Sequence, residues 1–317
     1  MTLSQKDFFK HMESRFTWAP FLKVTNLCNN FCAHCCERSG PNCEPKFIEL
    51  DDIKYILENF KYIKNFSNYV TITGGEPTMA YTAKSRNYIP QILRYCGING
   101  YDVYLNTNAR WILSENAEKI CSDFNDFVQK YKSKFLFRLS LDRFHDQAID
   151  ANAKFINWVV KNENIPDERT GIYMFFDKSD IIDKLLYKLV CEYDIKISDP
   201  IYANKNPSWC SIHKLNRTEK MLCITEYQGI VNIGRAKDNN IATKQPFSKT
   251  EIYFSPFIDT DNEICFDSNG YAMLSANDDD TIKTPYHNKR GKVKPIHVIK
   301  QELFDQAYKC LCSENQL

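Results

Sequence analysis

The chain has 317 residues, 43% of them hydrophobic and 26% charged, which is the composition of a globular rather than a disordered protein. The 41 basic and 40 acidic residues nearly cancel, so the sequence carries no electrostatic footprint for nucleic acid or anionic lipid. No apolar run reaches the roughly 18 residues of a membrane-crossing helix, and the start of the chain lacks the apolar segment of a secretory signal. We therefore expect a cytoplasmic protein without a nucleic-acid or membrane partner.

Cysteine is unusually frequent, with 13 residues. The number is odd, and nothing in the sequence directs export to an oxidising compartment. In a reducing cytosol such cysteines are more often metal ligands or catalytic thiols than disulfide partners. The sequence therefore points to metal or thiol chemistry.

Short β-rich runs predict six strands along the first three quarters of the chain, at Pro20–Thr25, Tyr69–Thr73, Asp102–Asn106, Phe135–Leu141, Gly171–Phe176 and Gly229–Gly234. Between the first two runs, Leu50–Phe60 has apolar residues at helical spacing, with two aspartates near its start, where the helix dipole favours acids. Alternating strands and helices predict an α/β fold with right-handed βαβ units and a parallel sheet. Six strands fit a partial barrel better than the full eight-stranded barrel of about 250 residues, and chemistry is then expected at the carboxyl ends of the strands.

Three cysteines follow the first predicted strand at the spacing CxxxCxxC: Cys28, Cys32 and Cys35. Closely spaced thiolates hold iron–sulfur clusters, usually four to a cluster. Three on one loop would cap three corners of a cube and leave the fourth iron open, as a catalytic site requires. The alternative is a zinc knuckle made of these cysteines, or Cys36 in place of Cys35, together with His34; however, no second CxxC or HxxxH pair completes a zinc site.

A Gly-Gly-Glu-Pro turn, Gly74–Pro77, ends the second predicted strand. Two glycines let the backbone approach a ligand closely, and the carboxylate of Glu76 can bind an amino group. Such a turn alone is a weak signal, because many tight turns follow strands. Its position one βα unit after the CxxxCxxC motif makes the turn a strong signal.

With these two motifs, the sequence resembles the radical S-adenosylmethionine (SAM) superfamily over roughly residues 18–236. The resemblance implies that Cys28, Cys32 and Cys35 hold a [4Fe–4S] cluster, and that Gly74, Gly75, Glu76 and Pro77 bind the SAM amino group. It also implies a partial (β/α)6 barrel. The family uses one electron to cleave SAM into methionine and a 5′-deoxyadenosyl radical.

Softer matches to the same family concern the rest of the SAM site. Thr107 and Asn108 follow the third strand, and Ser140 with Asp142 ends the fourth, where family members contact the SAM carboxylate and ribose. His34 stands where the family usually has an aromatic residue packed on the adenine, and an imidazole can still stack there. The resemblance therefore implies a complete cofactor site with one departure from the pattern.

We expect three regions: an N-terminal segment (1–17), the barrel (18–236) and a small C-terminal subdomain (237–317). In the last region Cys265 precedes a strand–turn–strand pattern with Asn269-Gly270 as the hairpin signal. This pattern resembles the twitch or SPASM-like extension of radical SAM peptide maturases, which implies a second, auxiliary [4Fe–4S] cluster. Cys310 and Cys312, read as an extended tail, would face the same cluster. One ligand of the usual pattern is missing, and we expect Cys210 to replace it.

Cys223 falls just before the last predicted strand, and Arg235 lies in a Gly-Arg-Ala segment familiar from peptide-modifying members. This layout resembles the epipeptide epimerases of Bacillus-type bacteria, which invert α-carbons in a ribosomally made precursor peptide. In that family a cysteine thiol returns a hydrogen atom to the face opposite the abstraction, and the resemblance gives this role to Cys223. It also implies a flavodoxin- or ferredoxin-type electron donor.

Two other functions compete with the epimerase hypothesis. A radical SAM maturase that forms a thioether or carbon–carbon crosslink would keep the cluster cysteines and need no donor thiol. A non-catalytic iron–sulfur or zinc protein would explain the cysteines and leave the Gly74–Pro77 turn without a task. Product stereochemistry distinguishes the first alternative, and SAM cleavage distinguishes the second.

Overall fold

The computed structural model describes residues 4–15, 17–145, 148–163, 165, 170–176, 179–204, 210–216, 218, 220–226, 234–243, 261–274 and 282–313. Its strands are β1 Thr17–Thr25, β2 Tyr69–Gly74, β3 Asp102–Thr107, β4 Phe135–Leu141, β5 Thr170–Phe176, β6 Tyr202–Asn204, β7 Cys210–Lys214, β8 Met221–Glu226, β9 Asp261–Asp267, β10 Tyr271–Met273 and β11 Lys283–Pro285. Its helices are α1 Gln5–Arg15, α2 Leu50–Phe60, η1 Pro77–Met79, α3 Ala80–Ala83, α4 Tyr88–Ile98, η2 Arg110–Leu113, α5 Ala117–Lys130, α6 Ala148–Lys161, α7 Ser179–Cys191, α8 Gly234–Asp238 and α10 Ile296–Ser313.

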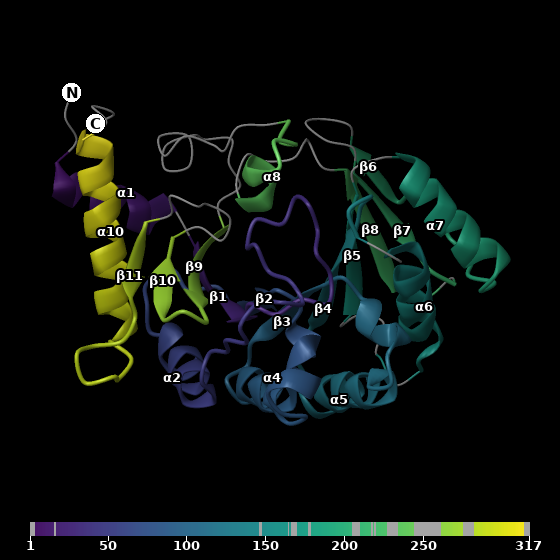
Figure 1. The fold of residues 1–317 in the computed structure, drawn as a ribbon, viewed down its shortest axis with the longest axis horizontal. Helices are drawn as coiled ribbons and strands as arrows, with labels where there is room; N and C mark the ends of the chain where they lie inside the picture. The colour runs from purple at the N-terminus through teal and green to yellow at the C-terminus, as the bar shows by residue number, and fades with distance from the viewer. Residues whose placement is uncertain are drawn as a thin grey trace.

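All the strands belong to one sheet, in the order β11-β10-β9-β1-β2-β3-β4-β5-β8-β7-β6. The seven strands from β9 to β8 in that order run parallel to one another, and antiparallel strands extend the sheet on both sides. The curved sheet and its outer helices form the arch in Figure 1. The prediction of an α/β fold with a partial barrel is confirmed.

The helices α2, α4, α5 and α6 follow the outer face of the sheet, where each connects one parallel strand to the next (Figure 1). Helix α2 shows why this face forms: Ile53, Ile56, Leu57 and Phe60 recur at helical spacing and are buried. Along β4, residues alternate between fully buried and half-buried, as expected for a strand with two different faces. The buried set packs with the helices, and the half-buried set faces the interior of the arch.

The sixth parallel strand differs from the prediction. The strand that pairs with β5 is β8, Met221–Glu226, which returns through an antiparallel meander with β7 and β6. The predicted strand Gly229–Gly234 lies outside the described residues except for its last glycine, which begins α8. Cys223 is therefore inside the sixth barrel strand, and the prediction that it precedes that strand was wrong.

The C-terminal strands continue the barrel sheet. Strand β9 pairs in parallel with β1 over seven residues, and β9 and β10 form the hairpin predicted from Asn269-Gly270. Gly270 has φ +88, the left-handed backbone that favours glycine in such a turn. Helix α10 packs beside β11 and α1, which brings the two ends of the chain together (Figure 1). Within the described ranges, none of the helices combines the length and apolar character that a bilayer crossing requires.

Candidate functional site

The three motif cysteines lie on the loop between β1 and α2, which we call the cluster loop (residues 26–49). The loop starts with a bridge between Leu27 and Gly40, and the amide of Cys28 donates to the Gly40 carbonyl at 3.3 Å. The amide of Cys35 donates to the Cys32 carbonyl at 3.2 Å, which turns the backbone between these two cysteines. Cys28 and Cys32 are buried, and Cys35 is half-buried.

The chemistry of these thiols fits a metal cluster. The sulfur of Cys28 accepts hydrogen bonds from the Asn30 amide at 3.4 Å and from Nδ2 of Asn108 at 3.7 Å. Burial raises the pKa of Cys28 to about 12 and also raises the pKa of Cys32. Bound metal would offset the cost of ionising these buried thiols, because it favours the thiolate over the thiol. A cluster spreads its thiolates over several irons, so its ligands need not meet as closely as those of a single ion.

Helix α8 fastens the cluster loop from a segment 200 residues later in the chain. The amide of Arg235 donates to the Cys35 carbonyl at 2.9 Å, and its buried guanidinium donates to the Ser39 carbonyl and lies 4.0 Å from the centre of the Phe31 ring. Arg38 forms an exposed ion pair with Asp238 at 2.9 Å. The Gly-Arg-Ala segment is thus part of the wall around the motif cysteines, a role that sequence reasoning did not assign to it.

The two glycines of the Gly74–Pro77 turn approach the cluster loop. The amides of Gly75 and Glu76 donate to the carbonyls of Thr25 and Leu27 at 2.8 and 2.7 Å. A side chain at Gly75 would come within 1.9 Å of the Leu27 carbonyl oxygen, and Gly74 has φ +125. The predicted close backbone approach is present, but the partner in the structure is the end of β1, so these glycines join β2 to the cluster loop.

The Glu76 carboxylate is completely buried and receives hydrogen bonds from this chain. Thr107 donates its hydroxyl at 2.9–3.0 Å, the Asn108 amide donates at 2.8 Å, and Thr78 donates through its hydroxyl at 2.7 Å. Burial raises the pKa of Glu76, and these hydrogen bonds oppose the rise. The carboxylate therefore ties the ends of β2 and β3 together, and its contact with a SAM amino group stays a prediction.

Asn108 connects the end of β3 to the cluster loop. Its Nδ2 donates to Oδ1 of Asn29 at 2.8 Å as well as to the Cys28 sulfur, while its Oδ1 accepts from the Arg110 amide at 2.9 Å. One strand position away from Thr107, Oδ1 of Asn106 is buried and has no hydrogen-bond partner among the described residues. A buried polar atom of this kind fits a site that takes a polar ligand.

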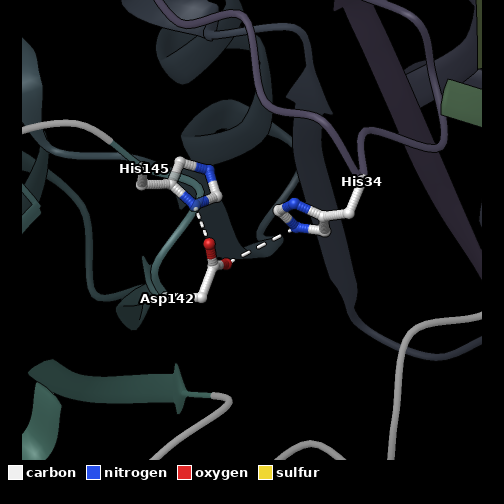
Figure 2. Close-up of side chains that lie close together, drawn as sticks. All are labelled: His34, Asp142 and His145. Atoms are coloured by element: carbon white, nitrogen blue, oxygen red, sulfur yellow. Dashed lines mark hydrogen bonds and ion pairs between the residues drawn. The ribbon is translucent and has the colours of Figure 1, made fainter. Parts of the chain in front are cut away.

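The end of β4 carries Asp142, which lies between two imidazoles (Figure 2). Oδ1 of Asp142 is 2.8 Å from Nδ1 of His145, and Oδ2 is 3.5 Å from Nε2 of His34. Burial raises the pKa of Asp142. The hydrogen bond and charge of His145 and the charge of His34 lower it by more, so the net shift of the pKa is downward. The Phe144 ring packs in a tilted orientation against the His34 ring, with the two ring centroids 4.7 Å apart. The structure thus brings His34 and Asp142 together, and their contact with SAM stays a prediction.

His145 was missed by sequence reasoning. The one available signal was its spacing, three residues after Asp142, where a turn can fold the imidazole back onto the carboxylate. The ligand atoms of His34, Asp142 and His145 lie within 4.8 Å of one another, close enough to share one cation as well as to orient the His34 ring. Ser140, two residues before Asp142, is half-buried on the inner face of β4.

Cys223 faces the interior of the arch from β8. Its neighbours Leu222 and Ile224 belong to the hydrophobic core under the helices, so the alternation of a strand turns Cys223 and Thr225 to the other face. Cys223 lines a cavity of about 690 Å³ bordered by the first residues of β2, β3 and β5. This cavity lies at the amino ends of the strands, opposite the end that carries the cluster loop.

The structure does not gather the four cysteines predicted for a second cluster. Cys210 begins β7, and its sulfur lies 3.8 Å from that of Cys223, while Cys265 is buried in β9 in the other half of the sheet. Cys310 and Cys312 belong to helix α10, so the expectation of an extended tail was wrong. Residues two apart in a helix point about 200° away from each other. Accordingly, Cys310 is half-buried against the core and Cys312 is exposed.

Comparison with known proteins gives one family match, to the radical SAM superfamily over residues 22–142. No curated protein matches the chain. The solved structures that align with it include native anSMEcpe with bound AdoMet (14% identity, 92% of this chain and 82% of that one, TM-score 0.46) and methylornithine synthase PylB (12% identity, 60% and 74%, TM-score 0.29). The matched range runs from β1 to Asp142 and contains the cluster loop and the Gly74–Pro77 turn. Residues 22–142 are therefore similar to the radical SAM superfamily.

Proposed function

We propose that this protein is a peptide epimerase, which converts L- to D-residues in a ribosomally made precursor peptide. The observation that carries the proposal is the position of Cys223, a thiol on the inner face of the sixth parallel strand and beside a cavity. Inversion at an α-carbon needs hydrogen removed on one face and returned on the other. A thiol in the interior of the barrel is a suitable second donor.

The radical SAM domain implies a [4Fe–4S] cluster and SAM, and the residues at the carboxyl end of the barrel fit both groups. Cys28, Cys32 and Cys35 would hold the cluster, and the ends of β2, β3 and β4 would surround SAM. When bound, these groups supply a 5′-deoxyadenosyl radical that can remove a hydrogen atom from an α-carbon. The chain itself positions the peptide between that end of the barrel and the thiol of Cys223.

The thiol then determines the stereochemical outcome. Loss of Hα leaves a nearly planar carbon, and Cys223 returns a hydrogen atom from the opposite face. Burial and the neighbouring Cys210 raise the pKa of Cys223 to about 11, so the group keeps its hydrogen at neutral pH. Thiol protons exchange with water, and the cavity beside Cys223 gives solvent a route to the sulfur. The new α-hydrogen should therefore come from water.

The proposal also includes a flavodoxin- or ferredoxin-type electron donor and an auxiliary cluster in the C-terminal region. Cys265 is the most protected candidate ligand there; burial raises the pKa of its thiol, while the ammonium group of Lys23 lowers it. For Cys310 and Cys312 to bind one cluster, the last turn of α10 would have to unwind, because the helix separates them. The place of Cys210 beside Cys223 argues against Cys210 as the fourth ligand.

The test is turnover in D₂O with the precursor peptide encoded nearest the gene. We expect one deuterium at each inverted α-carbon, with the abstracted hydrogen recovered in 5′-deoxyadenosine. Cys223→Ala should still bind iron and cleave SAM but form no D-residues, measured by chiral amino-acid analysis.

Cys121→Ala is the matched control, because Cys121 is also half-buried but lies on the outer helix α5. It should give D-residues at the wild-type level. Wild-type levels of D-residues from Cys223→Ala would contradict the proposed donor. A crosslinked peptide without D-residues would instead identify the protein as a different radical maturase.

A further inference from the structure

Cys223 has a second thiol within contact distance. The sulfur of Cys210 lies 3.8 Å from the sulfur of Cys223, across the antiparallel pair β7 and β8. The strand register places Cys210 opposite Thr225 and Ile212 opposite Cys223, so the two cysteines are diagonal neighbours on one face of the sheet. They are 13 positions apart in the chain, and only the meander brings them together.

Thr225 orients this thiol pair. Its hydroxyl donates to the sulfur of Cys210 at 3.6 Å and lies 3.9 Å from the sulfur of Cys223. The sulfur of Cys210 accepts the hydroxyl hydrogen, and either of the two thiols can donate its S–H to the other. The three side chains form a short chain of hydrogen bonds that runs from Thr225 through Cys210 to Cys223.

Cys223 lies toward the amino ends of the strands, away from the end where the radical is generated, and Cys210, opposite Thr225, lies two residues closer to the carboxyl end of β8. Cys223 and Ile212 line the 690 Å³ cavity at the amino ends of the strands, and Cys210 is half-buried beside them. The cluster loop and the Gly74–Pro77 turn are at the opposite ends of the strands. Cys210 therefore has contact with the proposed donor without being part of the cofactor site.

We propose that Cys210 is the thiol that reloads Cys223 after each inversion; this inference rests on the proposed function. Once Cys223 has given its hydrogen atom to the α-carbon, its sulfur carries an unpaired electron. The S–H bond of Cys210 breaks and an S–H bond on Cys223 forms, so one hydrogen atom moves and no charge is transferred. One electron from the flavodoxin- or ferredoxin-type donor and one proton from water then restore the Cys210 thiol.

This relay has a chemical advantage that a lone thiol lacks. The transfer breaks one S–H bond and forms another of the same kind, so it is close to thermoneutral. Cys223 therefore recovers its hydrogen atom while it stays beside the peptide. The radical moves from Cys223, which borders the cavity, to Cys210 at the start of β7. The D-residue is thereby protected from a second abstraction by the same sulfur.

The experiment counts D-residues per protein chain in Cys210→Ser, with Cys191→Ser as the control. Serine keeps the size of the side chain and its contact with Thr225, but its O–H bond is too strong to give up a hydrogen atom. Cys191 is an exposed thiol at the end of α7. We expect Cys210→Ser to form about one D-residue per chain and then stop, while the wild type and Cys191→Ser continue to turn over.

A nitrone spin trap with peptide mapping gives a second readout that does not depend on the rate. The trap should label Cys210 in the wild-type protein and Cys223 in Cys210→Ser. Multiple turnover by Cys210→Ser at the wild-type rate, or a trap adduct on Cys223 in both proteins, would overturn the relay. If the wild type itself makes no D-residue, the proposed function fails, and that result is distinct from a failure of the relay.

Discussion

The two ends of the barrel are built in opposite ways. At the carboxyl end, buried polar groups are held by many partners: the Glu76 carboxylate has donors from three residues, and the sulfur of Cys28 has two. At the amino end, a cavity of about 690 Å³ is bordered by Tyr69, Tyr104 and Tyr173 and by a thiol. The contrast suggests a division between a rigid end that controls cofactors and an open end that leaves room for substrate and solvent.

Aromatic contacts line the cavity at the amino end. The rings of Tyr69 and Tyr104 meet edge to face at 5.3 Å, and Arg138 lies 4.3 Å from the centre of the Tyr104 ring. Tyr173, the strand partner of Cys223, is 6.3 Å from Tyr104. These groups offer stacking surfaces and a cation. A lining of this kind can accept an extended peptide with varied side chains.

The largest expected effect is at the carboxyl end. Replacing Cys28, Cys32 and Cys35 together by alanine should abolish SAM cleavage, because the radical SAM cluster then has no thiolate ligands. Iron should fall from about eight to about four atoms per chain if the C-terminal region binds its own cluster. Anaerobic reconstitution followed by iron analysis and detection of 5′-deoxyadenosine measures both quantities.

Cys36→Ala is the control for that change, since Cys36 adjoins Cys35 but lies outside the motif. It should keep its iron and its SAM cleavage. Undiminished cleavage in the triple variant, or zinc in place of iron, would refute the radical SAM assignment of these cysteines.

The second prediction tests how much the carboxyl end depends on Glu76. Glu76→Ala removes the buried acceptor of the Asn108 amide and of the Thr78 and Thr107 hydroxyls. The loss should lower the free energy of unfolding by about 3–5 kcal/mol. Glu49→Ala removes a carboxylate whose exposed ion pair with Lys84 is worth about 0–1 kcal/mol. Anaerobic urea unfolding compares the two variants, and equal losses would show that the buried network contributes no more than a surface ion pair.

The smallest effect concerns the thiol at the amino end. Burial and Cys210 raise the pKa of Cys223 to about 11, and iodoacetamide reacts with the thiolate. Alkylation of Cys223 should therefore accelerate up to about pH 11, and in Cys210→Ala the midpoint should be lower. In the unfolded chain a cysteine thiol ionises at about pH 8.5. The contribution of Cys223 to the free energy of unfolding is therefore complete below that pH and is lost as the pH rises toward 11. A midpoint unchanged by Cys210→Ala would show that the two sulfurs do not interact.

The sequence predicted the carboxyl end better than the amino end, for a physical reason. The motifs at Cys28–Cys35 and Gly74–Pro77 are local, and each follows a strand whose β-rich pattern is clear, so their meeting at one edge follows from the parallel sheet. The pairing of Cys210 with Cys223 depends on a meander and a diagonal register that no local pattern encodes. The contact between Cys210 and Cys223 could therefore not be predicted from the sequence.

Two further misses have similar causes. The strand that pairs with β5 is Met221–Glu226, which the local pattern did not single out, and the predicted run Gly229–Gly234 lies outside the described residues except for Gly234. The tail around Cys310 and Cys312 was read as extended, but its apolar residues Leu303, Phe304 and Ala307 pack a helix against the core. In both places tertiary contacts, not local preference, decide the conformation.

The contacts of helix α8 and Asn239 with the cluster loop have a consequence for biosynthesis. Arg235 and Asp238 bind the loop by the contacts described above, and Asn239 donates to the Ala33 carbonyl at 2.8 Å; all three are made about 200 residues after the loop. At about 5–20 residues per second, a ribosome needs roughly 10–40 s to synthesise that stretch. Strand β9, which borders β1, is made later still. The nascent cluster loop thus lacks its contacts with α8 throughout this interval, and the three thiols stay more exposed than in the finished chain.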